Sequence, residues 1–117
     1  MGKRFEELKV RELAQELIND LWMIFYDKNF KNWSFQDQIM RACISVANNI
    51  AEGNERWSNK DFIKFLYYAK WSIWEVRSML YSAHKFWYIM QKQFDDLKDK
   101  CLSLSTKISN FIKVLKD

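Results

Sequence analysis

A chain of 117 residues is long enough for one domain with a single core and too short for two. It has no proline and only two glycines, Gly2 and Gly53, which argues against a turn-rich β fold and favours long helices. The net charge of +4, from 19 basic and 15 acidic residues interspersed along the chain, permits binding to nucleic acid without requiring it. The chain shows neither a signal-peptide pattern nor an apolar run of about 18 residues, so we expect a cytoplasmic protein that does not contact membranes.

The first half of the chain predicts two amphipathic helices. The first is expected over about residues 5–26, with apolar side chains spaced three or four apart: Phe5, Leu8, Leu13, Leu17, Leu21 and Ile24. In the second, Ser34 stands three residues before Asp37, a spacing typical of a capping box at a helix start. Its expected core positions are Phe35, Ile39, Ala42, Cys43, Val46 and Ile50. Gly53 is the expected left-handed cap at its end.

The second half predicts two more helices with the same period. Ser58 and Asp61 repeat the capping spacing and open a helix expected to reach about Met90. Its core positions are Phe62, Leu66, Ala69, Ile73, Val76, Leu80, Ala83 and Trp87. The last helix carries Phe94, Leu97, Cys101, Leu104, Ile108, Phe111 and Leu115. Alternating steps of three and four with short connections predict an all-α fold over residues 1–117, a single antiparallel up-down-up-down four-helix bundle.

Residues that support catalysis or metal binding are sparse. The single histidine, His84, has no acidic pair or nucleophile beside it in the pattern, and one His with two distant Cys does not make a zinc site. Cys43 and Cys101 fall at apolar helical positions and are expected to be small core residues rather than a disulfide. We therefore expect a protein that is not an enzyme, with no catalytic residue, metal, cofactor or small-molecule substrate.

A polar stripe on the second helix is not needed by a simple bundle. It consists of Gln38, Arg41, Ser45, Asn49 and Glu52, with Ser72 and Glu75 facing it from the third helix. These residues fall within a narrow arc next to the core positions, so an Arg41–Glu75 contact across the helices is expected. Three hypotheses fit the polar stripe: a buried hydrogen-bond network that fixes helix register, which we favour, a binding groove, or a catalytic site.

The third helix is apolar on more than its core side. An aromatic stripe of Tyr67, Trp71, Trp74, Tyr81 and Tyr88 lies about 140° from the core positions, and basic residues interleave with it: Lys60, Lys70, Arg77 and Lys85. Since a small monomer cannot bury two faces of one helix, Tyr67, Trp71, Trp74 and Tyr81 are predicted to form an oligomer interface. The alternatives are binding of single-stranded nucleic acid by the rings and the basic residues, or an excess of aromatic residues covered by Lys and Arg stems.

The second helix carries a recognisable motif. Gln38, Arg41-Ala42, Ser45-Val46 and Asn49-Ile50-Ala51-Glu52-Gly53 are followed by Arg56, Ser58, Asp61-Phe62, Phe65-Leu66, Ala69, Ser72 and Glu75, with Phe5, Leu8 and Tyr26 upstream. This pattern resembles the four-helix-bundle protein family encoded in intervening sequences of bacterial 23S ribosomal RNA genes. Two positions depart from the family pattern: Asn32-Trp33 stands in place of the usual Phe-Pro, and Trp71 in place of a small residue.

The resemblance implies an antiparallel four-helix bundle that assembles as a ring, typically a homopentamer. The family is also similar to the accessory protein of diversity-generating retroelements, a basic pentamer that binds nucleic acid and a reverse transcriptase. From this we expect a ring-shaped homo-oligomer that binds RNA, or a reverse transcriptase or other nucleoprotein, with Lys60, Lys64, Lys70, Arg77 and Lys85 as the nucleic-acid-binding residues. The alternative is a protein-interaction scaffold that binds no nucleic acid.

Overall fold

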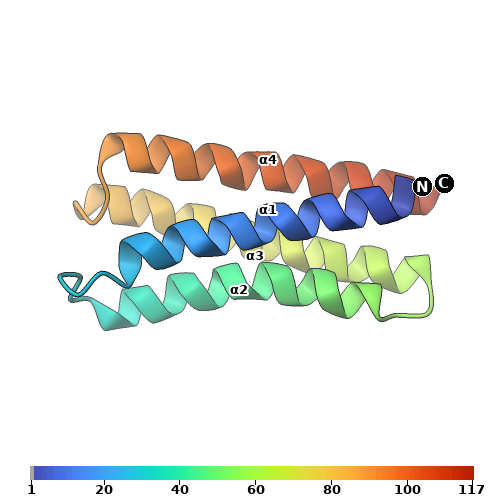
Figure 1. Ribbon diagram of the computed structural model, residues 1–117, viewed down its shortest axis with the longest axis horizontal. Coiled ribbons are helices and arrows are strands. Elements are labelled where there is room, and N and C mark those ends of the chain that lie inside the picture. Colours follow the sequence, from blue (N-terminus) through green and yellow to red (C-terminus); the bar gives the residue numbers. More distant parts are fainter. Residues whose placement is uncertain (1) are drawn as a thin grey trace.

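A computed structural model describes residues 2–117 and shows four helices. They are α1 (Gly2–Phe25), α2 (Trp33–Asn54), α3 (Asn59–Lys85) and α4 (Gln91–Lys116), and no strand occurs among these residues. The helices lie lengthwise beside one another in a body of 46 × 23 × 18 Å, and the N- and C-termini lie at the same end (Figure 1). The packed pairs are α1–α2, α2–α3, α3–α4 and α4–α1. The predicted all-α fold of four helices is confirmed.

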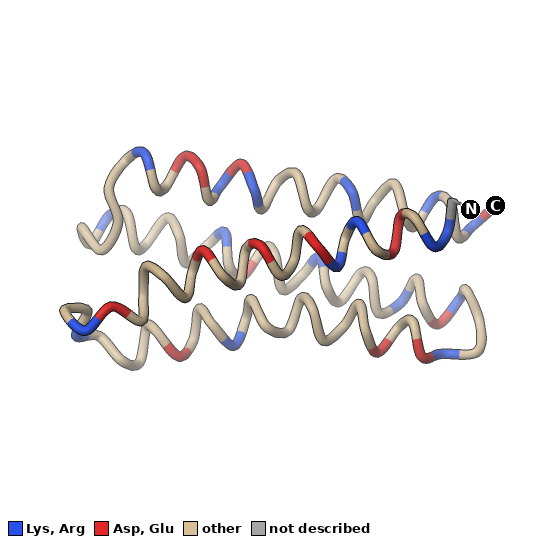
Figure 2. Tube along the Cα trace, viewed as in Figure 1, with Lys and Arg blue, Asp and Glu red and all other residues tan. Residues whose placement is uncertain are grey.

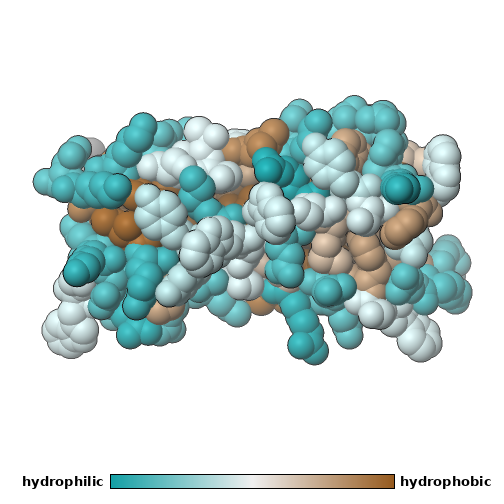
Figure 3. Space-filling model, turned by 180° about the vertical axis from the view of Figure 1, so that it is seen from behind, coloured by the Kyte–Doolittle hydropathy of each residue, from teal (hydrophilic) through white to brown (hydrophobic). Residues whose placement is uncertain are grey.

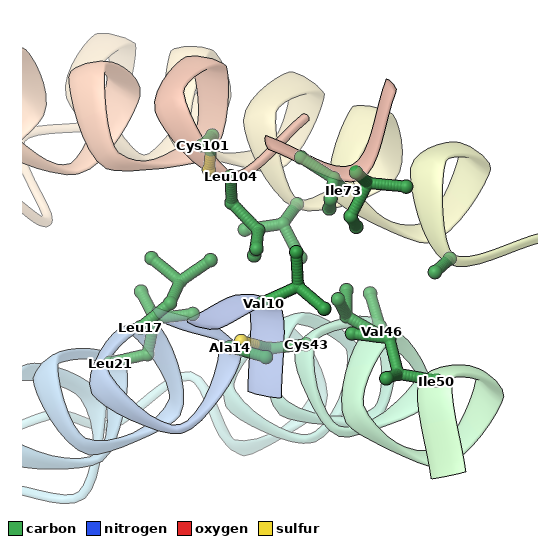
Figure 4. Close-up of a cluster of buried hydrophobic side chains, with 14 of the residues drawn as sticks. Val10, Ala14, Leu17, Leu21, Cys43, Val46, Ile50, Ile73, Cys101 and Leu104 are labelled. Atoms are coloured by element: carbon green, nitrogen blue, oxygen red, sulfur yellow. The ribbon is translucent and has the colours of Figure 1, made fainter. Parts of the chain in front are cut away.

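The core runs along the centre of the four helices. Figure 4 shows side chains from all four converging there, including Val10, Val46, Ile73 and Leu104. The predicted core positions of α4 are confirmed, and so are those of α2 except Phe35, which is half-buried against the core. Those of α3 are confirmed as far as Ala83. In α1 the prediction is partly wrong, because Phe5 and Leu8 are exposed and the buried positions are Val10, Ala14, Leu17, Leu21 and Phe25. Both sets satisfy a helical period, so spacing alone does not separate them.

Of the two N-caps predicted from the sequence, one is found in the structure. The Ser58 hydroxyl accepts a hydrogen bond from the Asp61 amide at 3.1 Å, which confirms the cap of α3. At α2 the predicted cap is wrong: the Oδ1 of Asn32 accepts from the Phe35 amide at 3.0 Å, and Ser34 lies inside the helix. Asn is as good an N-cap as Ser, so the helix starts at the earlier of the two candidates.

Gly53 has a different role from the predicted one. It lies inside α2, no glycine in the described chain has a positive φ, and the helix continues to Asn54. A Cβ added to Gly53 would stand 2.7 Å from Cδ1 of Phe62 and 3.0 Å from Cβ of Phe65. Gly53 is therefore required for the close approach of α2 and α3, not for a left-handed cap.

The end of α3 departs most from the sequence prediction. The helix ends at Lys85, Trp87 has a φ of 66°, and its amide donates to the His84 carbonyl at 3.2 Å. The Tyr88 amide donates to the Ala83 carbonyl at 2.8 Å, which completes a Schellman motif. As a result Trp87, which the sequence predicts to lie in the core, is 80% exposed. Tyr88 is not part of the exposed aromatic stripe, because it is half-buried and packs against the core at this turn. A glycine usually occupies this left-handed position, so no residue type in the sequence signals the stop.

The two cysteines lie in the core as predicted. Cys43 and Cys101 are both free and fully buried. Burial raises the pKa of each thiol to about 12. Both thiols are therefore protonated at neutral pH and act as small apolar side chains.

We predict that Gly53→Ala lowers the stability of the bundle. Alanine is favoured over glycine in a helix by about 1 kcal/mol, so an unhindered site would gain stability. Here the contacts with Phe62 and Phe65 force the two helices apart, which typically costs about 1–3 kcal/mol. Urea denaturation followed by circular dichroism measures whether the free energy of unfolding falls or rises. A gain in stability would show that the helices separate without cost.

We predict the opposite effect for Trp87→Gly. The left-handed conformation costs a residue with a Cβ about 1–2 kcal/mol, and the exposed indole of Trp87 contributes little packing to the folded chain. The melting temperature should rise by several degrees, corresponding to about 1 kcal/mol for a domain of this size. Trp57→Gly is the matched control, since Trp57 is fully exposed without a positive φ and should show no such gain.

Candidate functional site

The outer face of α3 presents four large aromatic side chains to solvent. Tyr67 is 41% exposed, Trp71 65%, Trp74 62% and Tyr81 53%. Figure 3 shows pale side chains of intermediate hydropathy gathered along the middle of this face. These four residues of the aromatic stripe are exposed in the single chain, and their role as an oligomer interface stays a prediction.

A depression of about 360 Å³ lies where this face meets α4. Its lining consists of Tyr67, Lys70, Trp71, Ile73, Trp74 and Arg77 from α3 and Ser105 from α4. The depression therefore combines exposed indole rings with two cationic side chains and a hydroxyl. We call it the α3/α4 groove.

Lys70 and Arg77 give the α3/α4 groove its charge. The Nζ of Lys70 donates to the Ser109 hydroxyl at 2.5 Å, so the ammonium is held over α4 by a neutral partner. Across residues 2–117, no ion pair includes either Lys70 or Arg77. Two half-buried cations without a carboxylate partner leave a positive potential that an anion can neutralise. Sequence analysis missed Ser105 and Ser109, although their spacing of four next to the core positions was a usable signal.

The structure does not bring the other three predicted nucleic-acid-binding residues into this groove. Lys60 and Lys64 are exposed near the start of α3, with the Lys64 ammonium 5.5 Å from the centre of the Phe65 ring. Lys85 is exposed at the opposite end of the helix. These residues are positioned to extend a basic surface but not to line the depression.

Basic and acidic residues are divided between the helix pairs. Lys and Arg outnumber Asp and Glu by five to two in α3 and by six to three in α4, a surplus of six positive charges. In α1 and α2 acidic residues outnumber basic ones by five to four and two to one (Figure 2). The positive surplus of the chain is therefore carried by α3 and α4.

Part of this surplus is neutralised at the contact with α1. Lys100 of α4 pairs with Glu16 at 2.9 Å and also with Asp20. The hydrogen bonds to Asp20 and Glu16 raise the pKa of Lys100 above its ordinary value. The acids of α1 thus bind a lysine on the far side of α4 and do not reach the α3/α4 groove.

The polar stripe forms a hydrogen-bond network at its centre. The hydroxyls of Ser45 and Ser72 lie 3.0 Å apart across α2 and α3. The Nδ2 of Asn49 donates to the Ser45 carbonyl at 2.8 Å and to the Ser45 hydroxyl at 3.1 Å. All three side chains are half-buried, so this part of the network links the two helices as expected.

The outer members of the polar stripe are not buried in the single chain. Gln38, Arg41, Glu52 and Glu75 are exposed, and no Arg41–Glu75 ion pair occurs among the residues described. The predicted contact is therefore wrong for the single chain. Arg41 borders a shallow depression beside Asp37, whereas Glu75 lies with Asn49, Trp71 and Trp74 around a separate one of about 590 Å³ between α2 and α3. Helix periodicity predicts the face on which Arg41 and Glu75 lie. It does not predict the distance between the ends of these two long side chains.

The described part of the chain contains neither a candidate metal site nor a membrane-spanning helix. Within residues 2–117, no three His, Cys, Asp or Glu side chains are close enough to hold a metal ion. His84 stacks on Phe94, with their ring centroids 4.8 Å apart. None of the described helices has the length and apolar character that crossing a membrane requires.

Comparison with known proteins places this arrangement in a family. A model of the 23S rRNA-intervening sequence protein family matches residues 6–110. The chain belongs to this family. No curated protein matches the chain in sequence. A solved structure of a protein of unknown function from the S23 ribosomal protein family of Bacteroides thetaiotaomicron is similar, with a TM-score of 0.78 and 22% identity over 97% of this chain and 99% of that one.

Membership of the 23S rRNA-intervening sequence protein family agrees with the resemblance carried by the α2 motif, and the solved structure supports the fold. The departure at Trp71 is explained by the geometry. The Trp71 ring points outward, 65% exposed, while its neighbour Ser72 provides the small contact with α2. A large residue here leaves the approach of the two helices unchanged and adds to the exposed aromatic surface.

We predict that Asn49→Ala lowers the free energy of unfolding by about 1 kcal/mol. The substitution removes two hydrogen bonds to Ser45 in a half-buried position. Asn48→Ala is the matched control, because Asn48 is exposed on the same turn and should change stability by less than about 0.5 kcal/mol. Equal changes in stability for Asn49→Ala and Asn48→Ala would contradict a structural role for the hydrogen bonds of the polar stripe.

Proposed function

We propose that this chain is a non-enzymatic subunit of a ring-shaped homo-oligomer that binds RNA, or a nucleoprotein, through the α3/α4 side. Each subunit is an antiparallel up-down-up-down bundle, and the resemblance of the α2 motif to its family favours a pentamer. The working compartment is the cytoplasm, and the function involves no cofactor or small-molecule substrate. The observation that carries the proposal is the α3/α4 groove, where Lys70 and Arg77 have no acidic partner within residues 2–117 and lie beside exposed indoles.

The groove chemistry suits a single strand. Cationic side chains next to aromatic rings bind nucleic acid by neutralising phosphates while bases stack on the rings, and each stacked base contributes about 1–3 kcal/mol. Lys70 and Arg77 supply the charge, and Trp71 and Trp74 the stacking surface. Ser105 offers a hydroxyl to a phosphate oxygen. Such contacts read few base edges, so we expect little sequence preference.

Assembly multiplies the charge. One subunit at +4 attracts a polyanion weakly, whereas a ring of about five subunits carries on the order of +20. Because the surplus lies on α3 and α4, the same basic side repeats around the ring. The ring also provides a use for the aromatic stripe, since the flank of Trp71 and Trp74 that faces α2 is available for a subunit contact.

The alternative function is a protein-interaction scaffold without nucleic-acid binding. It is favoured by the depression between α2 and α3, which combines Trp71 and Trp74 with the acidic Glu75 and no basic residue. A surface of this composition suits a protein partner better than a phosphate chain.

The proposal predicts salt-sensitive RNA binding. A fluorescent single-stranded RNA should bind at about 50 mM salt and lose affinity steeply by about 200 mM, with a slope of log K against log salt of about −0.7 per phosphate contact. Lys70→Ala and Arg77→Ala should each weaken binding and reduce the magnitude of the slope by about 0.7, because each substitution removes one phosphate contact. Fluorescence anisotropy measures both quantities.

Lys9→Ala is the matched control. Lys9 lies on α1, which packs against α2 and α4 but not α3 in the described chain, so its removal should leave affinity nearly unchanged. No binding at the lower salt by a confirmed oligomer would reject the RNA function in favour of the scaffold. Equal decreases in affinity for all three variants would reject the α3/α4 groove as the site.

The ring is tested separately. Light scattering coupled to gel filtration should show several subunits of 14.3 kDa at micromolar concentration. Trp74→Glu should shift the population toward the monomer, because a carboxylate cannot be buried at an apolar subunit contact without a partner. A wild-type chain that is monomeric would contradict the ring and leave the aromatic stripe as a ligand surface.

A further inference from the structure

A second depression lies at the end of the bundle, where the α1–α2 connection meets the turn between α3 and α4. It measures about 740 Å³, larger than the α3/α4 groove. Its lining consists of Asn29, Phe30, Lys31, Asn32, Trp33 and Ser34 from one segment and Trp87 and Tyr88 from the other. We call it the end pocket. Neither the family assignment nor the proposed RNA-binding side accounts for it.

Two indoles on the end pocket are not used to fold the chain. Trp33 is 72% exposed and Trp87 80%, and neither ring stacks on another aromatic ring within residues 2–117. Trp87 also occupies a left-handed position where glycine is favoured. A strained residue that contributes little to packing points to a role outside folding.

An aromatic cluster and a hydrogen bond join the two segments that line the end pocket. The Tyr88 ring packs edge-on against Phe30, with centroids 5.0 Å apart, and against Phe35 at 5.1 Å. Its hydroxyl accepts a hydrogen bond from the Nδ2 of Asn32 at 2.8 Å, and the same Asn32 caps α2. These contacts join the two chain segments that carry Trp33 and Trp87, so the two exposed indoles lie on segments that are held together.

Positive charge surrounds the end pocket. Residues 26–34 and 85–92 contain four lysines, Lys28, Lys31, Lys85 and Lys92, against one acid, Asp27, although Lys92 pairs with Asp96 at 3.8 Å. Lys31 lines the pocket. Lys85 and Lys92 belong to α3 and α4, so the basic surface of these helices continues to this end. Arg77 precedes Lys85 by eight residues, about 12 Å along the helix, which a few nucleotides can span.

We propose that the end pocket binds an unpaired nucleotide of an RNA held on the α3/α4 side. The base stacks on the indoles of Trp33 and Trp87, and its phosphate is neutralised by Lys31. This inference rests on the proposed RNA function and adds to it a preference for strands with an unpaired base. Exposed rings next to Lys31, which forms no ion pair within residues 2–117, suit a nucleotide, whereas an apolar peptide offers no anion for Lys31.

The experiment uses fluorine NMR of the full chain labelled with 5-fluorotryptophan. The six signals are assigned by single Trp variants. A ten-nucleotide single-stranded oligoadenylate should shift the signals of Trp33 and Trp87, whereas a blunt duplex, which has no unpaired base, should leave both unshifted. Trp87→Gly should weaken single-strand affinity about tenfold, the effect of removing the stacking surface of one base, without a decrease in stability. Trp57→Ala, at the opposite end of the bundle, is the control and should bind as wild type.

The outcomes separate the two proposals. If Lys70→Ala and Arg77→Ala weaken binding while RNA leaves the signals of Trp33 and Trp87 in the wild type unshifted, the α3/α4 groove is supported and the end pocket is rejected. If the two signals shift while the groove variants bind normally, the end pocket is supported as a nucleotide site, and the statement that the α3/α4 side holds the RNA is overturned. Equal shifts with single strand and duplex overturn the preference for an unpaired base. Signals of Trp33 and Trp87 that depend on protein concentration without RNA assign the pocket to a contact between copies and overturn the proposal.

Discussion

The close approach of α2 to α3 is the constraint on which the surface of this protein depends. Gly53 leaves no room for a Cβ against Phe62 and Phe65, and the hydroxyls of Ser45 and Ser72 meet across the same contact. Since Ser72 and Ile73 face inward, helix geometry directs Trp71 and Trp74 outward. Small residues inside and large rings outside are thus two results of one packing arrangement.

The division of charge gives this aromatic face its chemical character. The acids of α1 are occupied in part by Lys100 of α4, and the cations of the α3/α4 groove have no carboxylate partner in the described chain. Family membership and a similar solved structure support the fold, while the case for RNA depends on these side chains. The proposed RNA binding therefore rests on the placement of the charge rather than on the total charge.

The helices and most of the core could be predicted because apolar spacing records which side of a helix is buried. All seven predicted core positions of α4 are buried. The end of α3 could not be predicted, because neither glycine nor proline marks it. Trp87 adopts a left-handed conformation there that a residue with a side chain disfavours. The α3/α4 groove was found in part through Lys70, Arg77 and the aromatic stripe. The end pocket was missed because it joins residues 29–34 to residues 87–88, a proximity set by tertiary structure alone.

Asn59 has a consequence for how the bundle opens. Its Nδ2 donates to the Leu115 carbonyl at 3.1 Å, and its Oδ1 accepts from the Lys3 ammonium at 3.2 Å, so one side chain links the start of α3 to both terminal helices. Terminal turns normally fray independently and exchange their amide hydrogens fast. Here the last turn of α4 cannot separate without releasing Asn59. The hydrogen bond from Asn59 to Leu115 contributes about 1 kcal/mol, so fraying of the C-terminal turn is coupled weakly to the first turn of α3.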